Sequence, residues 1–279
     1  MELPISKSQI ELLGGRMAEK EGIDPADLAS FREVLTAYGE ALDLALDRTR
    51  DGLGVSPTSR IKSLGTTREK LLRTNGTGLK SMQDLAGMRI VEDFGRSGQD
   101  GLVTRLTELF DEDEREPKLI DRREVPSHGY RAVHVVVFPS GIPVEVQVRT
   151  VLQHEWANMF EKLADRVGRG IRYGEEPSPG LTDGEIRAAS SILDRDPEDL
   201  LAAQRDLVEA SRTMVGASLT MADAISEIEE LEKAAPPGFD FTEVKTEFAG
   251  QLGSLRLALD ELLKPDDMNR LRTIVRELR

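Results

Sequence analysis

The sequence predicts an α+β fold in which a β-rich middle segment lies between helical N- and C-terminal extensions. Apolar residues recur at helical spacing between residues 25 and 50, and short runs rich in valine and isoleucine follow between residues 84 and 149. Helical periodicity then returns and continues to the end of the chain. These three observations divide the 279 residues into N-terminal helices (1–55), a middle domain (56–175) and a C-terminal helical region (176–279).

The N-terminal segment is predicted to form two helices. Ser6 is a candidate cap for a helix that reaches about Lys20, and Asp24-Pro25 places an N-cap residue before a proline at the first helical position. The second helix is expected to end near Arg50, because glycines, Ser56 and Pro57 follow it. Its apolar residues are Leu28, Phe31, Leu35, Tyr38, Leu42 and Leu46.

The middle segment is predicted to alternate strands and helices. In chain order we expect a strand and a helix within 60–73, a strand at 84–91, a helix at 100–111, strands at 119–125, 132–138 and 143–149, and a helix at 150–167. The last two strands are predicted to form a hairpin with its turn at Pro139-Ser140-Gly141. Alternation along its second strand points the valines one way and Glu145, Gln147 and Arg149 the other.

The C-terminal region begins with a predicted linker. Residues 168–184 are rich in glycine and proline, and helical patterns follow, with interruptions near Pro236-Pro237 and Pro265. The long stretch at 197–234 has apolar residues at nearly every turn. That pattern favours a packed hairpin or an oligomerisation helix over a catalytic element.

Composition narrows the function classes. The net charge of -14 argues against general binding to long nucleic acid, although basic residues concentrate at 60–89 and 122–149. The absence of cysteine excludes thiolate metal sites and cysteine nucleophiles. No early apolar run resembles a signal peptide and no stretch is apolar for long enough to span a bilayer, so we expect a cytoplasmic protein that does not bind membranes.

Two carboxylates are the first chemical candidates. Asp84 enters the strand at 84–91, and Glu145 lies on the polar face of the hairpin. A lone aspartate here is more often a cap or turn residue, and a half-polar strand often just faces water. Together on neighbouring strands, the two suit a hard divalent cation such as Mg²⁺. Tyr130 and His134, four residues apart, add an aromatic ring and an imidazole beside Glu145.

A basic cluster is the second candidate. Arg60 and Lys62 face one side of an entering strand, while Thr66 and Lys70 lie four residues apart on a following helix. Ammonium, guanidinium and hydroxyl groups at a helix start favour phosphate. A solvated basic helix has the same pattern, and the cluster alone does not decide between the two.

These segments together resemble the synthetase domain of the RelA/SpoT family. The resemblance covers roughly residues 59–173 and rests on HGYRAVHVVV, VEVQVRT and QHEWA, with DLAGMRIV and the looser RIKS block before them. It implies a small mixed β-sheet flanked by helices, similar to nucleotidyltransferases. It also implies a GTP pyrophosphokinase (ATP:GTP 3′-diphosphotransferase), which moves pyrophosphate from ATP to the ribose 3′-hydroxyl of GDP or GTP and releases AMP.

The resemblance also assigns roles to individual residues. Asp84 and Glu145 would hold Mg²⁺, and Glu145 would activate the 3′-hydroxyl. For ATP, Arg60 and Arg89 would lie on either side of the adenine, and the phosphates would be bound by Lys62, Thr66 and Lys70. For the acceptor, Tyr130 would stack on the guanine and His134 would contact phosphate. Gln147 and Arg149 would support the site from beside Glu145.

The chain departs from the family pattern in two places. The family usually has a basic residue shortly before the Gly-Tyr pair, where this chain has Pro126-Ser127-His128, so His128 or Arg123 is a candidate substitute. Long members carry a hydrolase domain marked by a His-Asp pair. No such dipeptide occurs here, and we expect a small synthetase without hydrolase activity.

Other functions remain open at the sequence level. Toxin-like relatives pyrophosphorylate the tRNA 3′ end or make adenosine alarmones, and the acidic net charge disfavours tRNA. A catalytically inactive nucleotide sensor would keep the pocket and lose the reaction, but the two carboxylates argue against it. Small members of the family are often oligomeric through terminal helices, so we expect a homo-oligomer.

Overall fold

The structure, a computed structural model, describes residues 3–19, 22–73, 78–178, 181–236, 238–262 and 275. The chain forms two compact units: unit 1 comprises Met1–Arg122 and Ala132–Thr150, and unit 2 comprises Arg123–Arg131 and Val151–Arg279. The three-segment division expected from the sequence stays a prediction, because compactness does not by itself set the boundary of a functional domain.

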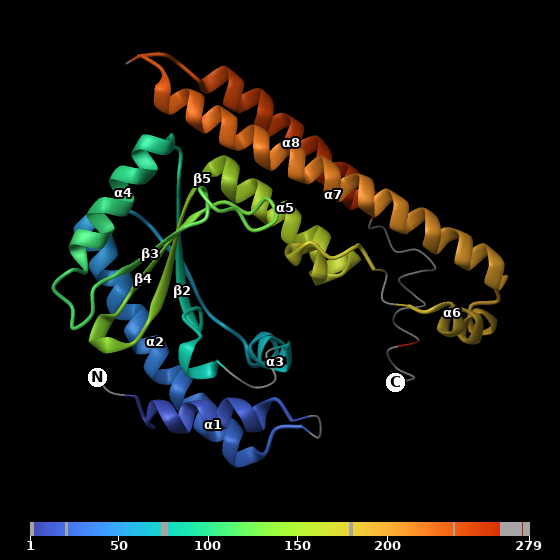
Figure 1. The fold of residues 1–279 in the computed structure, drawn as a ribbon, viewed down its shortest axis with the longest axis horizontal. Helices are drawn as coiled ribbons and strands as arrows, with labels where there is room; N and C mark the ends of the chain where they lie inside the picture. The colour runs from blue at the N-terminus through green and yellow to red at the C-terminus, as the bar shows by residue number, and fades with distance from the viewer. Residues whose placement is uncertain are drawn as a thin grey trace. The chain divides into compact units, whose positions relative to one another are not determined.

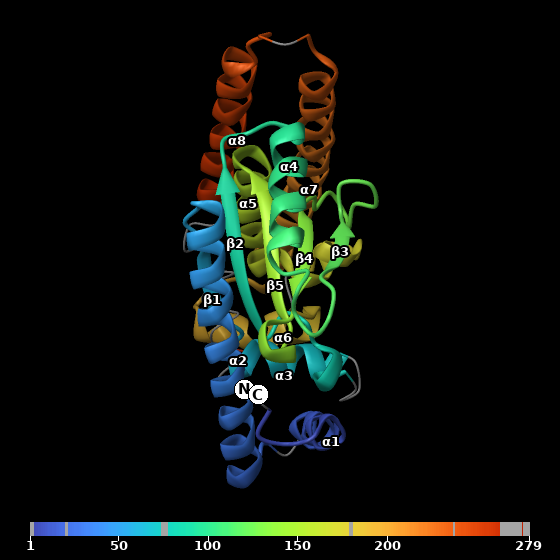
Figure 2. The ribbon, with the colours of Figure 1, turned by 90° about the vertical axis from the view of Figure 1, so that its left-hand side faces the viewer.

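Unit 1 is built on a five-stranded mixed sheet in the order β1-β2-β5-β4-β3 (Figures 1 and 2). Strands β2 and β5 pair in parallel, and every other neighbouring pair is antiparallel. The expected mixed sheet flanked by helices is therefore confirmed. The strands are β1 Thr58–Ile61, β2 Ala86–Glu92, β3 Lys118–Asp121, β4 Val133–Val137 and β5 Val144–Thr150.

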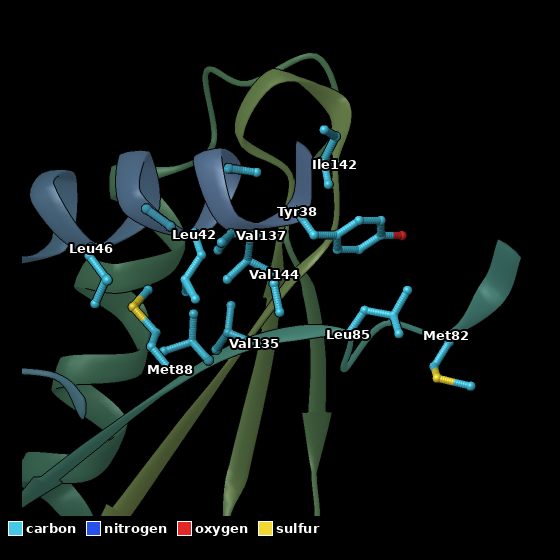
Figure 3. Packing of buried hydrophobic residues seen from close by; sticks show 14 of the residues in the cluster. Tyr38, Leu42, Leu46, Met82, Leu85, Met88, Val135, Val137, Ile142 and Val144 are labelled. Carbon is cyan, nitrogen blue, oxygen red and sulfur yellow. The ribbon is translucent and has the colours of Figure 1, made fainter. Parts of the chain in front are cut away.

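Two helices of unit 1 cover the valine-rich face of this sheet. Helices α2 and α4 pack against β2, β4 and β5, and Figure 3 shows Leu42 and Leu46 of α2 beside Met88, Val135 and Val144. Burial of these apolar side chains is the main source of stability here. The elements are α1 Lys7–Met17, α2 Pro25–Leu53, α3 Leu64–Arg73, η1 Leu79–Ser81, α4 Arg96–Leu109 and η2 Pro139–Gly141.

The N-terminal helices begin at the predicted caps. Ser6 and Gln9 form a reciprocal capping box at α1, and the Asp24 side chain accepts from the Ala26 backbone at α2. Helix α2 ends at Gly54, whose φ of 68° lies in the left-handed region that glycine adopts readily. Lys20, where the first helix was expected to end, lies outside the described residues.

Unit 2 is helical. Helix α5 packs against α7 and α8, which follow one another as a hairpin around a shared apolar cluster. Residues 197–234 form one continuous helix, so the expected hairpin within this stretch is wrong; the hairpin is instead formed by α7 together with α8. The elements are α5 Val151–Val167, η3 Arg169–Tyr173, α6 Asp183–Ala189, η4 Ser190–Ile192, α7 Pro197–Ala234 and α8 Thr242–Leu262.

Several element boundaries differ from the sequence prediction. Strand β2 begins at Ala86, so Asp84 precedes the strand rather than entering it. Helix α4 begins at Arg96, before the predicted 100, because its first turns contain glycine and polar residues that carry no apolar pattern. Strand β3 ends at Asp121, and the predicted linker at 168–184 contains η3. Among the described residues, no helix is long and apolar enough to cross a membrane.

Candidate active site

The register of unit 1 puts the ionisable candidates on one face of the sheet. Gly87 lies opposite Glu145, and Arg89 lies opposite Gln147, in the parallel β2–β5 pair. His134 of β4 faces Gln147 from the other side. Because side chains alternate along a strand, these residues project from the face opposite to α2 and α4, and we call it the polar face.

A ladder of hydrogen bonds runs along the polar face and centres on Glu145. The Nδ1 atom of His134 lies 2.9 Å from Oε1 of Glu145, and the Gln147 amide donates to Oε2 at 2.8 Å. The Arg149 guanidinium donates to Oε1 of the Gln147 side chain at 2.8 Å. This contact turns the side-chain amide nitrogen of Gln147 toward Glu145. Both oxygens of the Glu145 carboxylate are thus held by neighbouring side chains.

The ladder also fixes the charge state of Glu145. Burial would by itself raise the pKa of this carboxyl, and the nearby charge of Asp84 acts in the same direction. Hydrogen bonds from His134 and Gln147 outweigh both effects and leave the pKa below its ordinary value. Glu145 is therefore an ionised, oriented carboxylate at neutral pH, the state that a proton acceptor or a metal ligand requires.

Asp84 lies just before β2 and is bound by two lysines. Lys62, which follows β1, pairs with Oδ2 of Asp84, and Lys70 of α3 pairs with Oδ1 at 3.1 Å. Burial would raise the pKa of Asp84, but hydrogen bonds and charge from the two lysines outweigh it and lower the pKa. Asp84 is therefore also ionised.

The metal site expected of these two carboxylates stays a prediction. The charge of Asp84 acts on the pKa of Glu145, and Gly87 brings the backbones of β2 and β5 together. A Cβ atom at Gly87 would lie 3.3 Å from the backbone oxygen of Glu145. In the described part of the chain, no three His, Cys, Asp or Glu side chains form a metal site. Two carboxylates fit a hard divalent cation whose other ligands are water and phosphate oxygens.

The other residues expected to bind ATP lie on the same unit. Arg60 is exposed on β1 opposite Gly87, so it shares the polar face with half-buried Arg89. Thr66 lies at the start of α3, where its backbone nitrogen donates to the Ser63 side chain at 3.2 Å. The sequence prediction that Thr66 and Lys70 share one helix is confirmed by α3.

Tyr130 belongs to unit 2 and follows a tight turn. The backbones of Ser127 and Tyr130 bond reciprocally, and the two residues between them, His128 and Gly129, have φ values of 47° and 81°. Positive φ at both central positions defines a type I′ turn, which favours glycine. Tyr130 is half-buried and packs beside the apolar cluster of unit 2, so its ring is not sealed in the interior. Its stacking role stays a prediction.

Histidines and the tryptophan outside this set have structural contacts. The His128 ring lies against Gly174, where an added Cβ would come within 2.4 Å of it. Trp156 is buried, stacks on Phe160 and donates to the Ser218 carbonyl oxygen at 2.6 Å, so it is a core residue. The His154 ring lies 2.9 Å from the Asn158 amide.

Sequence reasoning missed two residues that shape this region, Ser63 and Gln99, and it did not predict the contact of His134. Ser63 caps α3 and so positions Thr66. Gln99 is fully buried in α4 and donates to the Val148 carbonyl oxygen at 2.9 Å. His134 was expected on acceptor phosphate, whereas its contact here is with Glu145. Only Ser63 carried a sequence signal, because serine directly before a helix is a common cap.

Comparison with known proteins decides the family. Residues 59–164 match the model for the region found in RelA/SpoT proteins. Uncharacterized proteins from Mycobacterium bovis and Mycobacterium tuberculosis are 36% identical over 206 residues, which covers 71% of this chain and 74% of theirs. The chain belongs to the RelA/SpoT family. The matched region contains every candidate of the sequence analysis, from Arg60 to Arg149.

Solved structures with a lower similarity were also found. Small alarmone synthetase 1 from Bacillus subtilis is 19% identical, with a TM-score of 0.44 over 74% of this chain and the whole of that one. A structure of that enzyme bound to its product pppGpp gives 21% identity and a TM-score of 0.41, over 52% of this chain and 86% of that one.

Proposed function

We propose that this RelA/SpoT family member transfers pyrophosphate from ATP to the ribose 3′-oxygen of GDP or GTP, which yields a (p)ppGpp-type alarmone and AMP. One observation carries the proposal. Two ionised carboxylates, from segments about 60 residues apart, lie near enough for the charge of Asp84 to act on Glu145, and two lysines bind Asp84. Family membership supports the same reaction class.

In this proposal Glu145 removes the proton of the attacking hydroxyl. An alcohol is a weak nucleophile near neutral pH, and a positioned base accelerates such a step by about 10²–10⁴-fold. The 3′-oxygen then forms a bond with the β-phosphorus of ATP, and the bond from that phosphorus to the bridging α–β oxygen breaks. AMP leaves with the bridging oxygen, and the proton stays on Glu145. His134 and Gln147 keep the carboxylate oriented for this transfer.

The remaining residues bind and orient the substrates. We assign the ATP phosphates to Lys62, Thr66 and Lys70, whose ammonium and hydroxyl groups favour anions. Arg60 and Arg89 would enclose the adenine, and Tyr130 would stack on the acceptor base. Asp84 and Glu145 would hold Mg²⁺, which when bound neutralises negative charge on the transferring phosphates. Removing water from around these groups strengthens each of these interactions.

Product identification tests this proposal. Purified full-length chain is incubated with Mg²⁺, ATP labelled at the β-phosphate, and separately GDP, GTP, an adenosine nucleotide or tRNA. We expect label on GDP or GTP, equimolar AMP, and no transfer by Glu145→Gln. Label on tRNA or on the adenosine nucleotide would replace the proposed acceptor. Nucleotide binding without transfer to any acceptor would favour a sensor.

Self-association is a separate proposal. Helices α7 and α8 carry exposed apolar side chains, including Leu231, Val244 and Leu257, which suit contact with a second copy of the chain. We infer a homo-oligomer through these helices. Light scattering during size-exclusion chromatography tests it: a monomeric mass at micromolar concentration would contradict the inference.

A further inference from the structure

Both oxygens of the Asp84 carboxylate are paired with lysine side chains. Each of its two oxygens already has an ammonium partner, Lys62 at Oδ2 and Lys70 at Oδ1. The Lys62 side chain is only 12% exposed and that of Asp84 is 25% exposed, so water screens the pair incompletely. A carboxylate in this state is a poor ligand for an incoming cation.

The formal charges of the two carboxylates and of the two lysines that bind Asp84 sum to zero. Asp84 and Glu145 contribute two negative charges, and Lys62 and Lys70 contribute two positive charges. Within the described ranges, no group of three His, Cys, Asp or Glu side chains is arranged to hold a metal ion. A bare divalent cation entering here would therefore face two ammonium groups at close range, and like charges at such distances repel strongly in a partly buried site.

The triphosphate of ATP removes this obstacle. Phosphate oxygens are strong acceptors for ammonium groups, and Lys70 projects from the first helix after β1 with its side chain 35% exposed, so it has room to reorient. When both lysines turn to the phosphates, the oxygens of Asp84 become available. The phosphates that arrive with the cation would supply the negative charge that compensates the lysines.

We propose that Lys62 and Lys70 act as a counter-ion lock on Asp84: they exclude the bare divalent cation and release the carboxylate only to a cation that arrives as a complex with a nucleoside triphosphate. The lock rests on the proposed function, because it takes Asp84 as a cation ligand. It assigns the two lysines a second task besides phosphate binding, namely selection of the metal–nucleotide complex over the free metal.

Binding of Mn²⁺ alone tests the lock without any turnover. Free Mn²⁺ is counted by electron paramagnetic resonance for the wild-type full-length chain and for the double variant Lys62→Met/Lys70→Met, which keeps the aliphatic stems and removes both charges. We expect the double variant to bind Mn²⁺ at least about tenfold more tightly, a conservative figure for the loss of two nearby positive charges. Lys118→Met, on exposed strand β3 at the other edge of the sheet, is the charge-matched control and should leave Mn²⁺ affinity unchanged.

Two further measurements locate the effect. Adding Asp84→Asn to the double variant should abolish the gain in Mn²⁺ affinity. The complex of Mn²⁺ with an ATP analogue that has a methylene group between the α and β phosphates should bind wild type well and the double variant at least about tenfold more weakly, because the phosphates lose two cationic partners. A single variant, Lys70→Met, gives the same direction of change if the double variant does not fold.

The lock is overturned if wild type binds Mn²⁺ alone as tightly as the double variant, or if the gain survives Asp84→Asn. It is equally overturned if removing the lysines weakens binding of Mn²⁺ alone. These outcomes are independent of product formation. A chain that makes no alarmone yet shows the lysine-dependent Mn²⁺ pattern would contradict the proposed acceptor and reaction while leaving the lock intact.

Discussion

Strand β5 presents two different surfaces within seven residues. Val144, Val146 and Val148 are fully buried on the face under α2 and α4, where they contribute to the apolar core. Glu145 and Gln147 alternate with them and belong to the hydrogen-bonded ladder of the polar face. The same backbone thus serves packing on one side and charge placement on the other.

The difference teaches how the two faces should respond to substitution. The apolar face gains free energy from burial and contains no group that reacts. The polar face buries ionised side chains, which contributes little net stability but holds them in a fixed geometry. Changes on the apolar face should therefore lower the stability of the fold, and changes on the polar face should lower the rate of the reaction.

The largest expected effect is on the polar face. Glu145→Gln removes the proposed proton acceptor while preserving size, and we expect kcat to fall about 10³-fold, roughly 4 kcal/mol of activation free energy. The melting temperature should stay close to that of wild type. Steady-state rates of AMP release together with thermal unfolding monitor both. A kcat within threefold of wild type would remove Glu145 from the chemistry.

The neighbouring residue on the other face should behave in the opposite way. Val146→Ala deletes two buried methyl groups and leaves a small cavity, which we expect to destabilise the fold by about 2 kcal/mol. The rate per folded molecule should change little. Denaturant unfolding and kcat at a temperature where the variant is folded provide the comparison. Loss of kcat without loss of stability would break the separation of the two faces.

Much of this fold was predictable because its signals are local. The cap at Ser6, the Asp24-Pro25 helix start and the valine alternation around Glu145 each depend on residues adjacent in the chain, and the structure has all three. Helix α4 was predicted to start too late. Its early turns bury Arg96 and Gln99, polar residues that a periodicity of apolar side chains does not detect.

The sequence predicted which residues belong to the candidate site, but it did not predict the contacts between their side chains. Motif resemblance selected Asp84, Glu145 and His134, and residues 59–164 match the family. That Lys62 and Lys70 bind Asp84, and that His134 binds Glu145, depends on side-chain geometry across strands. The His134–Glu145 contact depends on the register of β4 and β5, and the lysine contacts depend on how α3 and the segments beside β1 and β2 pack, which a single sequence does not specify.

A smaller effect is expected one step away from Glu145. Gln147→Leu removes the donor to Oε2 of Glu145 and should lower kcat about tenfold, since a hydrogen bond to a charged group contributes about 1.5–3 kcal/mol and His134 still orients the carboxylate. The KM for either substrate should change less than kcat. A rise in KM with unchanged kcat would make Gln147 a substrate-binding residue instead.

A substitution at Arg149 tests whether Arg149 and Gln147 act through the same contact with Glu145. Because its guanidinium contacts the Gln147 carbonyl oxygen, Arg149→Met should act on kcat through the orientation of that amide. In the Gln147→Leu background the same substitution should then add little further loss. Fully additive losses in the double-mutant cycle would show that the two residues act independently.

The smallest expected effect is a pH-dependent loss of stability in Asp84→Asn, which a variant on the apolar face should not show. The pKa of Asp84 is lowered in the folded chain from its ordinary value of 3.8, so its ionised form contributes stability above about that pH. The contribution is lost as the pH falls through the lowered pKa. Asp84→Asn should therefore be less stable than wild type at pH 6, and the gap in melting temperature should narrow toward pH 3.

Val146→Ala is the control for this pH series, because its cavity involves no titrating group. Its deficit in melting temperature relative to wild type should stay nearly constant from pH 6 to pH 3. If the gap between Asp84→Asn and wild type also stays constant, the lysine pairs do not stabilise the ionised carboxylate. If the difference in melting temperature from wild type narrows for Asp84→Asn but not for Val146→Ala, the pH-dependent part of the stability comes from the polar face. The contribution of the apolar face is then independent of pH.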